Sequence, residues 1–446
     1  MKLPLPPQSP LILPDFTFGV ATAAFQIEGA SHDKGRVPSI WDTFCDTPGK
    51  VFNGDNGHIA CDHFNRMDAD LDLIQSLQFD AYRFSVAWPR VQSAPGKWNP
   101  IGMDFYDRLV DGLLTRGIKP HVTLYHWDLP QFFEDTGGWL NRDIVPRFVD
   151  YADKVTRRLG DRVTAYATLN EPWCSAYLGY RWGIHAPGKT SDADGFLAMH
   201  HLLLAHGSAI PVMRENAPAA AHGIVLNFTP AYPATDSAAD QRAAAQCDDE
   251  NSHCFASAVF AGRYPTSVQE RHPDWWPEFP EEDLAIISTP LDFLGVNFYT
   301  RQVVRATSDI DFEPVPQPQA EHTDIGWEIY PDALTHVLTD LHTRYTLPPI
   351  YITENGAAGA DSINEQDQVI DDQRCRYYAS HLNAVDRAMM AGVNIKGYFA
   401  WSLMDNFEWA EGYNKRFGIV YVDYVSQRRL PKQSALMFKD FLTERQ

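Results

Sequence analysis

The sequence predicts an α/β protein that folds as a single (β/α)8 TIM barrel over residues 1–446, with long insertions in the loops that follow the strands. Short apolar runs rich in β-branched and aromatic residues occur eight times, each separated from the next by enough chain for a helix. None is followed by the Gly-rich phosphate-binding turn that an open doubly wound sheet usually carries. Eight strand–helix units without that turn favour a closed barrel.

The expected elements alternate along the whole chain. The eight strands are expected at 17–25, 81–88, 121–127, 162–170, 222–228, 291–299, 349–355 and 395–401. Helical periodicity between them predicts helices at 67–79, 104–117, 142–160, 202–216 and 375–392. Four connections are long, namely 28–65, 171–199, 229–290 and 300–330. The stretches 307–324 and 357–373 are expected to be surface loops, because neither has a core pattern of its own.

Composition excludes several classes of protein. With 37 Lys and Arg against 58 Asp and Glu, the formal charge is −21, which argues against a nucleic-acid partner. Hydrophobic residues make up 44% and charged residues 21%, as expected for a globular protein rather than a disordered one. No run of 18 apolar residues predicts a membrane span, and prolines interrupt the N-terminal segment where a secretion signal would lie.

The six cysteines have no C-x-x-C spacing. They fit reduced thiols better than a disulfide framework or a zinc site. We therefore expect a cytoplasmic protein with no metal and no cofactor.

Polar and aromatic residues stand where the expected strands end, which is where barrel enzymes build their sites. These residues are Gln26, Glu28, His126, Trp127, Asp128, Asn170, Glu171, Asn297, Tyr299, Glu354, Asn355, Trp401, Asp405, Glu408 and Trp409. Amides and carboxylates can bind sugar hydroxyls, and tryptophan faces can cover the C–H surface of a pyranose ring. The pattern indicates a sugar-binding cleft.

Two carboxylates have the placement that glycoside hydrolysis requires. Glu171 ends the run YATLN and Glu354 follows YIT, so each closes a buried strand. They are 183 positions apart, yet only three strands apart around the ring. One carboxyl could protonate the leaving oxygen while the other attacks the anomeric carbon or activates water. At about 5.5 Å, their repulsion would be roughly 3 kcal/mol, or about 2 pKa units, which keeps one of them protonated near neutrality.

Each candidate also has a structural interpretation. A glutamate at a strand end commonly forms a salt bridge in a loop. Arg83, inside the apolar strand AYRFS, either makes a structural ion pair or keeps a catalytic carboxylate ionised. His126 is a packed core histidine or a sugar ligand. Trp127 has the position of a core residue. We nevertheless include it, with its neighbour His126, among the expected substrate-binding residues.

The motifs together resemble family 1 glycoside hydrolases, the β-glucosidase and β-galactosidase group, over nearly the whole chain. FGVATAAFQIEGA (18–30) is similar to the N-terminal signature of the family, with Phe25 where tyrosine is more usual. TLNEP (168–172) resembles its acid/base motif and ITENG (352–356) its nucleophile motif. YHWDLP (125–130), GVNFYT (295–300) and WSLMDNFEWAEGYNKRFG (401–418) complete the resemblance.

The resemblance implies a role for each candidate. Glu171 would act first as general acid and then as general base, and Glu354 as the nucleophile of a retaining reaction. Arg83, Asn297 and Tyr299 would set the charge and position of Glu354. The sugar cleaved from the substrate would be held by Gln26, His126, Asn170, Glu408 and Trp409. Trp401 would stack under its ring, Phe417 would close the pocket, and Trp327 would face the aglycone.

The resulting hypothesis is a retaining, exo-acting β-glucosidase for small β-glucosides and cello-oligosaccharides, with a role in cellulose degradation. Glu408 stands where family members acting on 6-phosphosugars carry a serine, and its charge would repel phosphate. The main alternative is a transglycosylating β-glycosidase with β-galactosidase or β-fucosidase side activity. A non-catalytic sugar-binding barrel would be expected to lack one of the two glutamates, and a metal-dependent hydrolase would need ligands beside His126.

Overall fold

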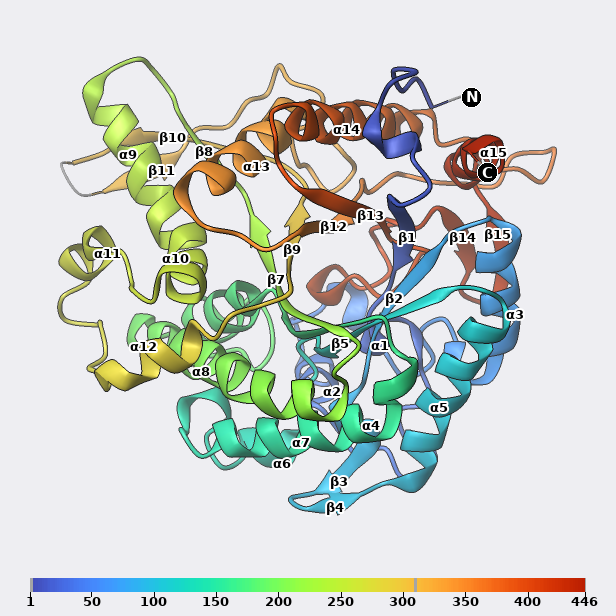
Figure 1. The fold of residues 1–446 in the computed structure, drawn as a ribbon, viewed down its shortest axis with the longest axis horizontal. Coiled ribbons are helices and arrows are strands. Elements are labelled where there is room, and N and C mark those ends of the chain that lie inside the picture. Colours follow the sequence, from blue (N-terminus) through green and yellow to red (C-terminus); the bar gives the residue numbers. More distant parts are fainter. Residues whose placement is uncertain (1–2, 309–310, 446) are drawn as a thin grey trace.

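The computed structural model describes residues 3–308 and 311–445, and its centre is a closed barrel of parallel strands (Figure 1). Around the ring the strands follow the order β1-β13-β12-β9-β7-β6-β5-β2. Their bounds are β1 Thr17–Ala21, β2 Ala81–Ser85, β5 Lys119–Tyr125, β6 Ala165–Asn170, β7 Ala221–Phe228, β9 Phe293–Phe298, β12 Ile350–Asn355 and β13 Ile395–Trp401. Each overlaps one of the eight expected runs. The predicted (β/α)8 barrel is confirmed.

Aromatic rings fill the interior of the barrel. His121 lies 4.9 Å from Phe399 and 5.8 Å from Tyr351 between ring centroids, and Phe293 packs edge-on against Tyr351 at 5.7 Å. Small residues make room for these rings: a Cβ added at Gly19 would lie 2.4 Å from the ring of Phe399. The interior is therefore a packed floor beneath the C-terminal strand ends rather than a pore.

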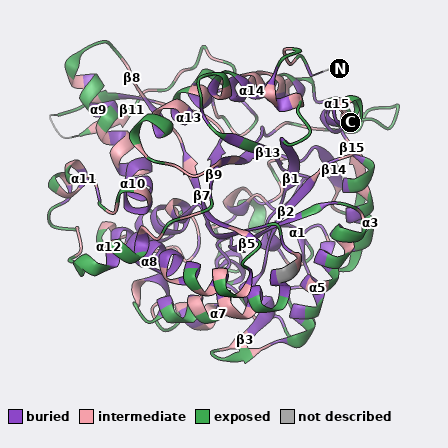
Figure 2. Ribbon diagram, in the orientation of Figure 1, coloured by how far each residue is buried: buried purple, intermediate pink, exposed green. Residues whose placement is uncertain are grey.

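Helices surround the barrel, with their buried faces turned to the strands (Figures 1 and 2). The principal ones are α3 His63–Ser76, α5 Pro100–Thr115, α7 Ile144–Leu159, α8 Asp192–Asn216, α13 Asp332–Arg344, α14 Asp372–Met390 and α15 Gln433–Arg445. In α7 the buried residues include Ile144, Phe148, Tyr151 and Val155, which recur at the spacing of one helical face. The helices expected at 67–79, 104–117, 142–160 and 375–392 overlap α3, α5, α7 and α14.

The helix α8 begins ten residues before the expected start at 202. Ser191 caps it by accepting a hydrogen bond from the backbone N–H of Asp194, and acidic residues in its first turn complement the helix dipole. Because the first turn of α8 is polar, the apolar pattern of the sequence does not indicate this start. The connection expected at 171–199 is therefore shorter than predicted. Within the described part of the chain, α8 alone has the length and hydropathy of a membrane span, and 78% of that apolar stretch is buried inside the molecule.

The long connections carry structure of their own. The connection after β6 contains the π-helix η5 (Cys174–Arg181). The one after β7 contains β8 Ala231–Pro233, α9 Ala238–Asp248, η6 Asp249–His253, α10 Cys254–Ala261, α11 Thr266–Arg271 and α12 Glu281–Ile287. The segment 307–324 contains β11 (Phe312–Pro314), which pairs with β10 (Gln302–Ala306). The segment 357–373 is not wholly at the surface, because the side chain of Asp361 is only 5% exposed and pairs with Arg374 and Lys432 at 2.7 and 2.5 Å.

Short elements complete the structure. They are η1 Pro10–Ile12, α1 Ala24–Ile27, α2 Ile40–Cys45, η2 Phe52–Gly54, α4 Trp88–Val91, β3 Gln92–Ala94, β4 Lys97–Trp98, α6 Gln131–Glu134, η3 Gly138–Leu140, η4 Gly160–Arg162, η7 Trp409–Glu411, β14 Val420–Asp423 and β15 Arg428–Pro431. Of these, α1 and η7 follow β1 and β13, so both lie on the side of the barrel where the strands end.

Candidate active site

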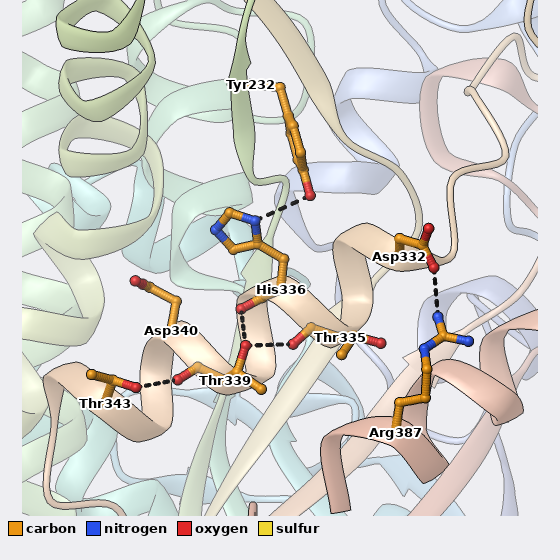
Figure 3. Close-up of a pocket in the computed structure, with 8 residues that line it drawn as sticks. All are labelled: Tyr232, Asp332, Thr335, His336, Thr339, Asp340, Thr343 and Arg387. Atoms are coloured by element: carbon orange, nitrogen blue, oxygen red, sulfur yellow. Dashed lines mark hydrogen bonds and ion pairs between the residues drawn. The ribbon is translucent and has the colours of Figure 1, made fainter. Parts of the chain in front are cut away.

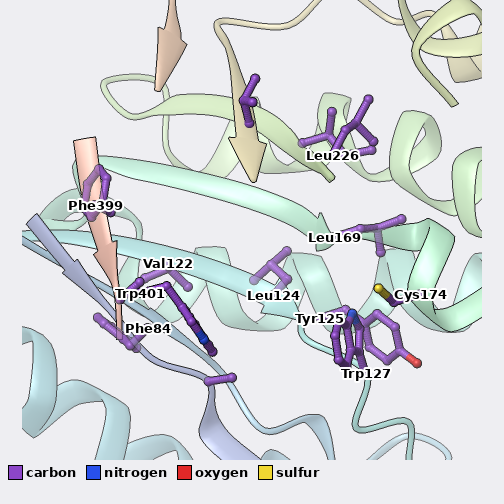
Figure 4. Packing of buried hydrophobic residues seen from close by; sticks show 14 of the residues in the cluster. Phe84, Val122, Leu124, Tyr125, Trp127, Leu169, Cys174, Leu226, Phe399 and Trp401 are labelled. Carbon is purple, nitrogen blue, oxygen red and sulfur yellow. The ribbon is translucent and has the colours of Figure 1, made fainter. Parts of the chain in front are cut away.

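A cleft of about 590 Å³ opens at the C-terminal ends of the barrel strands. Glu171, directly after β6, and Glu354, in β12, both line it. Nine other residues expected in the site line the same cleft, namely His126, Trp127, Asn297, Tyr299, Trp327, Trp401, Glu408, Trp409 and Phe417. Figure 4 shows Trp127 beyond the end of β5 and Trp401 on β13. Arg83 and Asn170 are buried behind this surface and hydrogen-bond to the lining residues Glu354 and Asn297. Gln26 is also buried but does not line the cleft, and its amide nitrogen donates to Asn406 and to the Phe407 carbonyl.

Glu354 is held as a carboxylate. Arg83 Nη1 donates to its Oε1 at 2.7 Å, and the hydroxyl of Tyr299 donates to its Oε2 at 2.7 Å. The side chains of Glu354 and Arg83 are 4% and 3% exposed, so solvent screens their ion pair little. Burial raises the pKa of Glu354 above its ordinary value, and the Arg83 charge and then the hydrogen bond from Tyr299 oppose that rise. Both oxygens are therefore oriented and the negative charge is stabilised.

Glu171 has no cationic partner among its hydrogen bonds in the described structure. Asn297 Nδ2 donates to its Oε1 at 2.6 Å and the Cys174 thiol donates to its Oε2 at 2.9 Å. Burial, and next the negative charge of Glu354, raise the pKa of Glu171 to about 7. Because the cation is beside Glu354, that residue ionises first and Glu171 keeps the proton.

An amide network connects the two glutamates. Asn170 Oδ1 accepts from Arg83 Nη2 at 2.7 Å and from Asn297 Nδ2 at 3.1 Å. The hydroxyl of Thr353 donates to Asn297 Oδ1 at 2.7 Å, which fixes the orientation of that amide. Arg83 and Asn297 thus each contact one glutamate and share Asn170, so the relative position of the two carboxyl groups is set by buried side chains.

This asymmetry predicts a bell-shaped dependence of rate on pH. The rate should rise as Glu354 loses its proton and fall as Glu171 loses its own, with the two limbs reporting apparent values of the pair. In Glu354→Gln the pKa of Glu171 should fall, because a neighbouring negative charge is gone. The measurement is the titration of Glu171 by carboxyl-carbon NMR in wild type and Glu354→Gln. An unchanged pKa would contradict the coupling.

Three buried polar atoms of the expected sugar-binding residues have no hydrogen-bond partner among the described residues. They are Gln26 Oε1, His126 Nδ1 and Glu408 Oε2. His126 Nε2 lies 3.0 Å from the Asn170 amide nitrogen, which donates to it, so His126 Nδ1 carries the ring proton and can donate. Burial, and next the charges of Glu354 and Glu171, raise the pKa of Glu408 to about 8. His126 and Glu408 line the inner end of the cleft, so His126 Nδ1 and Glu408 Oε2 are available to bind the hydroxyls of a sugar.

Aromatic rings form the walls around these polar atoms. His126 stacks with Trp401 and with Trp409, both at 5.9 Å between centroids, and Trp127 lies 4.5 Å from Trp409. Trp127 also donates from Nε1 to the Asn170 carbonyl at 2.8 Å, so it both supports the network and lines the cleft. On the other side Trp327 packs against Tyr299 and Phe417.

The backbone is strained at three of these residues. Glu171, Trp127 and Trp409 have φ of 44°, 79° and 49°, in the left-handed region that costs side-chain-bearing residues free energy. Such conformations persist where the surrounding structure enforces them, and they concentrate at functional sites. Here the three residues, one with a carboxyl and two with aromatic side chains, line the same cleft.

Four of the polar residues expected at strand ends are not among the residues that line the cleft. Glu28 accepts from Arg90 and Tyr106, both at 2.7 Å, and Asp405 pairs with Arg416 and Lys432. The Asn355 amide donates to the Phe298 carbonyl. Asp128 is buried, and desolvation raises its pKa to about 8.

The sequence interpretation missed several cleft residues, which are Trp173, Cys174, Leu178, Ile184, His185, Asn227, Phe228, Thr229, Thr300, Ile325, Ala410 and Glu411. Cys174 had a readable signal, since it follows Glu171 by three positions, the spacing of neighbours on a helix. The others lie mostly in connections without a motif.

A second hollow, of about 630 Å³, lies between α13, α14 and Tyr232 (Figure 3). Its polar groups are largely paired within the protein: Arg387 binds Asp332, Tyr232 bonds to His336, and the hydroxyls of Thr339 and Thr343 donate to helix carbonyls. It lacks the coupled carboxyl pair that the first cleft has.

Comparison with known proteins agrees with this geometry. The profile of glycosyl hydrolase family 1 matches residues 10–446, and the chain belongs to that family. It is 50% identical to a β-glucosidase of Agrobacterium sp. over 428 residues, covering 94% of this chain and 93% of that protein. It is 43% identical to a bifunctional β-D-glucosidase/β-D-fucosidase of Bifidobacterium breve, covering 96% and 97%.

Solved structures are similarly close. The family 1 β-glucosidase of Exiguobacterium antarcticum B7 superposes with a TM-score of 0.94 at 44% identity, over 97% of this chain and 98% of that one. The β-glucosidase of Thermotoga maritima in complex with isofagomine lactam gives 0.94 at 42% identity with the same coverage.

Proposed function

We propose that this chain is a retaining, exo-acting β-glucosidase that removes non-reducing terminal β-D-glucosyl residues from small β-glucosides and cello-oligosaccharides. The observation that carries the proposal is the unequal pair of buried carboxyls in one cleft. Glu354 accepts a hydrogen bond from the Arg83 guanidinium, whereas Glu171 accepts hydrogen bonds only from the Asn297 amide and the Cys174 thiol. One is prepared to act as a nucleophile and the other as an acid.

The reaction proceeds in two displacements. First, a Glu354 oxygen bonds to the anomeric carbon as the bond to the aglycone oxygen breaks, and Glu171 gives its proton to that oxygen. Next, the Glu171 carboxylate takes a proton from water, whose oxygen bonds to the anomeric carbon as the Glu354 ester bond breaks. Two inversions leave the configuration unchanged. When a sugar hydroxyl replaces water, the product is a new glycoside.

The inner end of the cleft supports exo action on unphosphorylated sugars. His126 is 2% exposed and Glu408 Oε2 is buried, so the polar atoms at this end are enclosed, as the binding of one terminal sugar requires. Neither lysine nor arginine is among the described residues that line the cleft, so a phosphate group would find no such cationic partner there. The name of the Bifidobacterium breve relative supports a fucosidase side activity. We further propose a cytoplasmic location and a role in cellulose breakdown; six free, buried cysteines support the location.

The test is to follow the hydrolysis of 4-nitrophenyl β-glucoside by proton NMR, before the released sugar equilibrates, with and without chelator. We expect β-glucose to appear first, activity to survive chelation, and 4-nitrophenyl β-glucoside 6-phosphate to react at least about tenfold more slowly. α-Glucose as the first product would contradict the retaining mechanism.

A further inference from the structure

The mouth of the cleft differs in chemistry from its inner end. Five partly exposed apolar side chains line the mouth, and we call them the outer wall: Trp173, Leu178, Ile184, Ile325 and Trp327. The inner end carries buried amide, imidazole and carboxyl groups. The outer wall therefore offers a ligand an apolar surface, whereas the inner end offers polar groups.

The outer wall comes from two connections. Trp173 and Leu178 lie just before and within η5, and Ile184 follows it, whereas Ile325 and Trp327 lie between β11 and α13. Ile184 is 55% exposed, although it is apolar. When an apolar ligand covers a large, solvent-exposed apolar side chain at the entrance of a cleft, binding becomes more favourable because apolar surface is removed from water.

The two tryptophans of the outer wall are held in place. Trp173 Nε1 donates to Asn251 Oδ1 at 3.1 Å, and its ring packs edge-on against Trp182 at 5.6 Å. Trp327 lies 5.3 Å from Tyr299 and 5.9 Å from Phe417. Because the Trp173 donor is already occupied by a protein partner, this ring offers an incoming ligand mainly its apolar faces.

The mouth also carries polar groups, but none of them belongs to the outer wall. The lining polar residues there are His185, Asn227, Thr229, Thr300 and Glu411. The hydroxyl of Thr300 already donates to the Glu328 carbonyl at 2.8 Å. Glu411 adds a carboxylate close enough to Glu408 to raise the pKa of that residue. A sugar hydroxyl that faces the aliphatic side chains of the outer wall would be left unpaired, and an anionic group near Glu411 would meet like charge.

We infer that the preferred substrates are β-glucosides of uncharged apolar alcohols, alkyl or aryl, rather than β-glucosides whose aglycone is a second sugar. This inference rests on the proposed function and narrows it: the polar inner end binds the glucosyl group, and the outer wall binds the aglycone. Each methylene covered by the outer wall strengthens binding of the transition state through burial of apolar surface.

The test compares kcat/KM for methyl, butyl, hexyl and octyl β-glucoside with kcat/KM for cellobiose and cellotriose. The alkyl alcohols have similar acidity as leaving groups, so chain length changes mainly the burial of the aglycone. We expect about a tenfold rise or more from methyl to hexyl, because partial burial captures a fraction of the roughly fourfold gain per methylene. Hexyl β-glucoside should exceed both oligosaccharides. A flat series, or cellobiose ahead of hexyl β-glucoside, would overturn the inference.

A matched pair of variants assigns the effect to the outer wall. Ile184→Asn should lower the octyl-to-methyl ratio of kcat/KM about threefold or more. Ile101→Asn makes the same change at a 50% exposed isoleucine on α5, outside the residues that line the cleft, and should keep the wild-type ratio. Equal ratios in both variants would contradict the assignment.

Retaining hydrolysis of 4-nitrophenyl β-glucoside with a flat alkyl series would defeat this inference alone, whereas no hydrolysis of any β-glucoside would defeat the proposed function.

Discussion

Glu354→Ala is expected to lower kcat for 4-nitrophenyl β-glucoside by about 10⁴-fold or more. The variant removes the atom that bonds to the anomeric carbon, and it leaves the Arg83 guanidinium buried without its carboxylate partner. Azide is small enough to enter the space left by the side chain and can attack the same face of the sugar. The product should then be the α-glucosyl azide, because only one inversion occurs.

The measurement is steady-state kinetics with product analysis by NMR, with and without azide. Glu365→Ala, which removes an exposed glutamate from the connection before α14, is the matched control and should keep wild-type activity. Wild-type activity in Glu354→Ala, or formation of the β-azide by that variant, would be incompatible with a nucleophilic role for Glu354.

Glu171→Ala should show the second-largest loss, about 10²- to 10⁴-fold in kcat/KM for substrates with poor leaving groups. Its acid function matters most when the departing oxygen needs a proton, so the loss should be much smaller for a 2,4-dinitrophenyl glucoside. That contrast separates a missing acid from a misfolded cleft, because misfolding would affect both substrates equally.

In the same variant azide should give the β-glucosyl azide, since Glu354 still forms the intermediate and azide then replaces water. Kinetics on the two substrates and the configuration of the azide product are the readouts. An equal loss on both substrates, without azide product, would argue against the acid/base assignment.

Much of the fold was predictable because barrel strands are buried on both faces and read as continuous apolar runs. The runs at 81–88 and 395–401 correspond to β2 and β13. The start of α8 was not predictable in the same way, because its first turn is acidic and its apolar pattern begins later. The single-domain organisation stays a prediction.

The position of the site was also predictable, since the C-terminal ends of parallel strands meet at one rim. Strand-end polarity by itself, however, does not separate cleft residues from structural ones. Glu28 and Glu354 both bind an arginine and a tyrosine, at similar distances. Only the three-dimensional structure shows that Glu354 lies in the cleft together with Glu171, whereas Glu28 lies outside the cleft.

The division of roles between the two glutamates depends on contacts made across the barrel. Arg83 in β2 reaches Glu354 in β12, and Asn297 in β9 reaches Glu171 after β6. No spacing along the chain encodes such contacts, so the motif resemblance gave the roles and the structure supplies the physical reason. The roles themselves stay predictions until the variants are measured.

The most direct test of the two-carboxylate account is to trap the intermediate. A 2-deoxy-2-fluoro-β-glucoside with a dinitrophenyl leaving group should inactivate the protein, because fluorine destabilises the oxocarbenium-like transition state of both steps and the good leaving group restores only the first. Mass spectrometry of the digested protein should find one fluoroglucosyl group, attached to the peptide that contains Glu354. Attachment to any other residue, or turnover without a covalent adduct, would contradict the account.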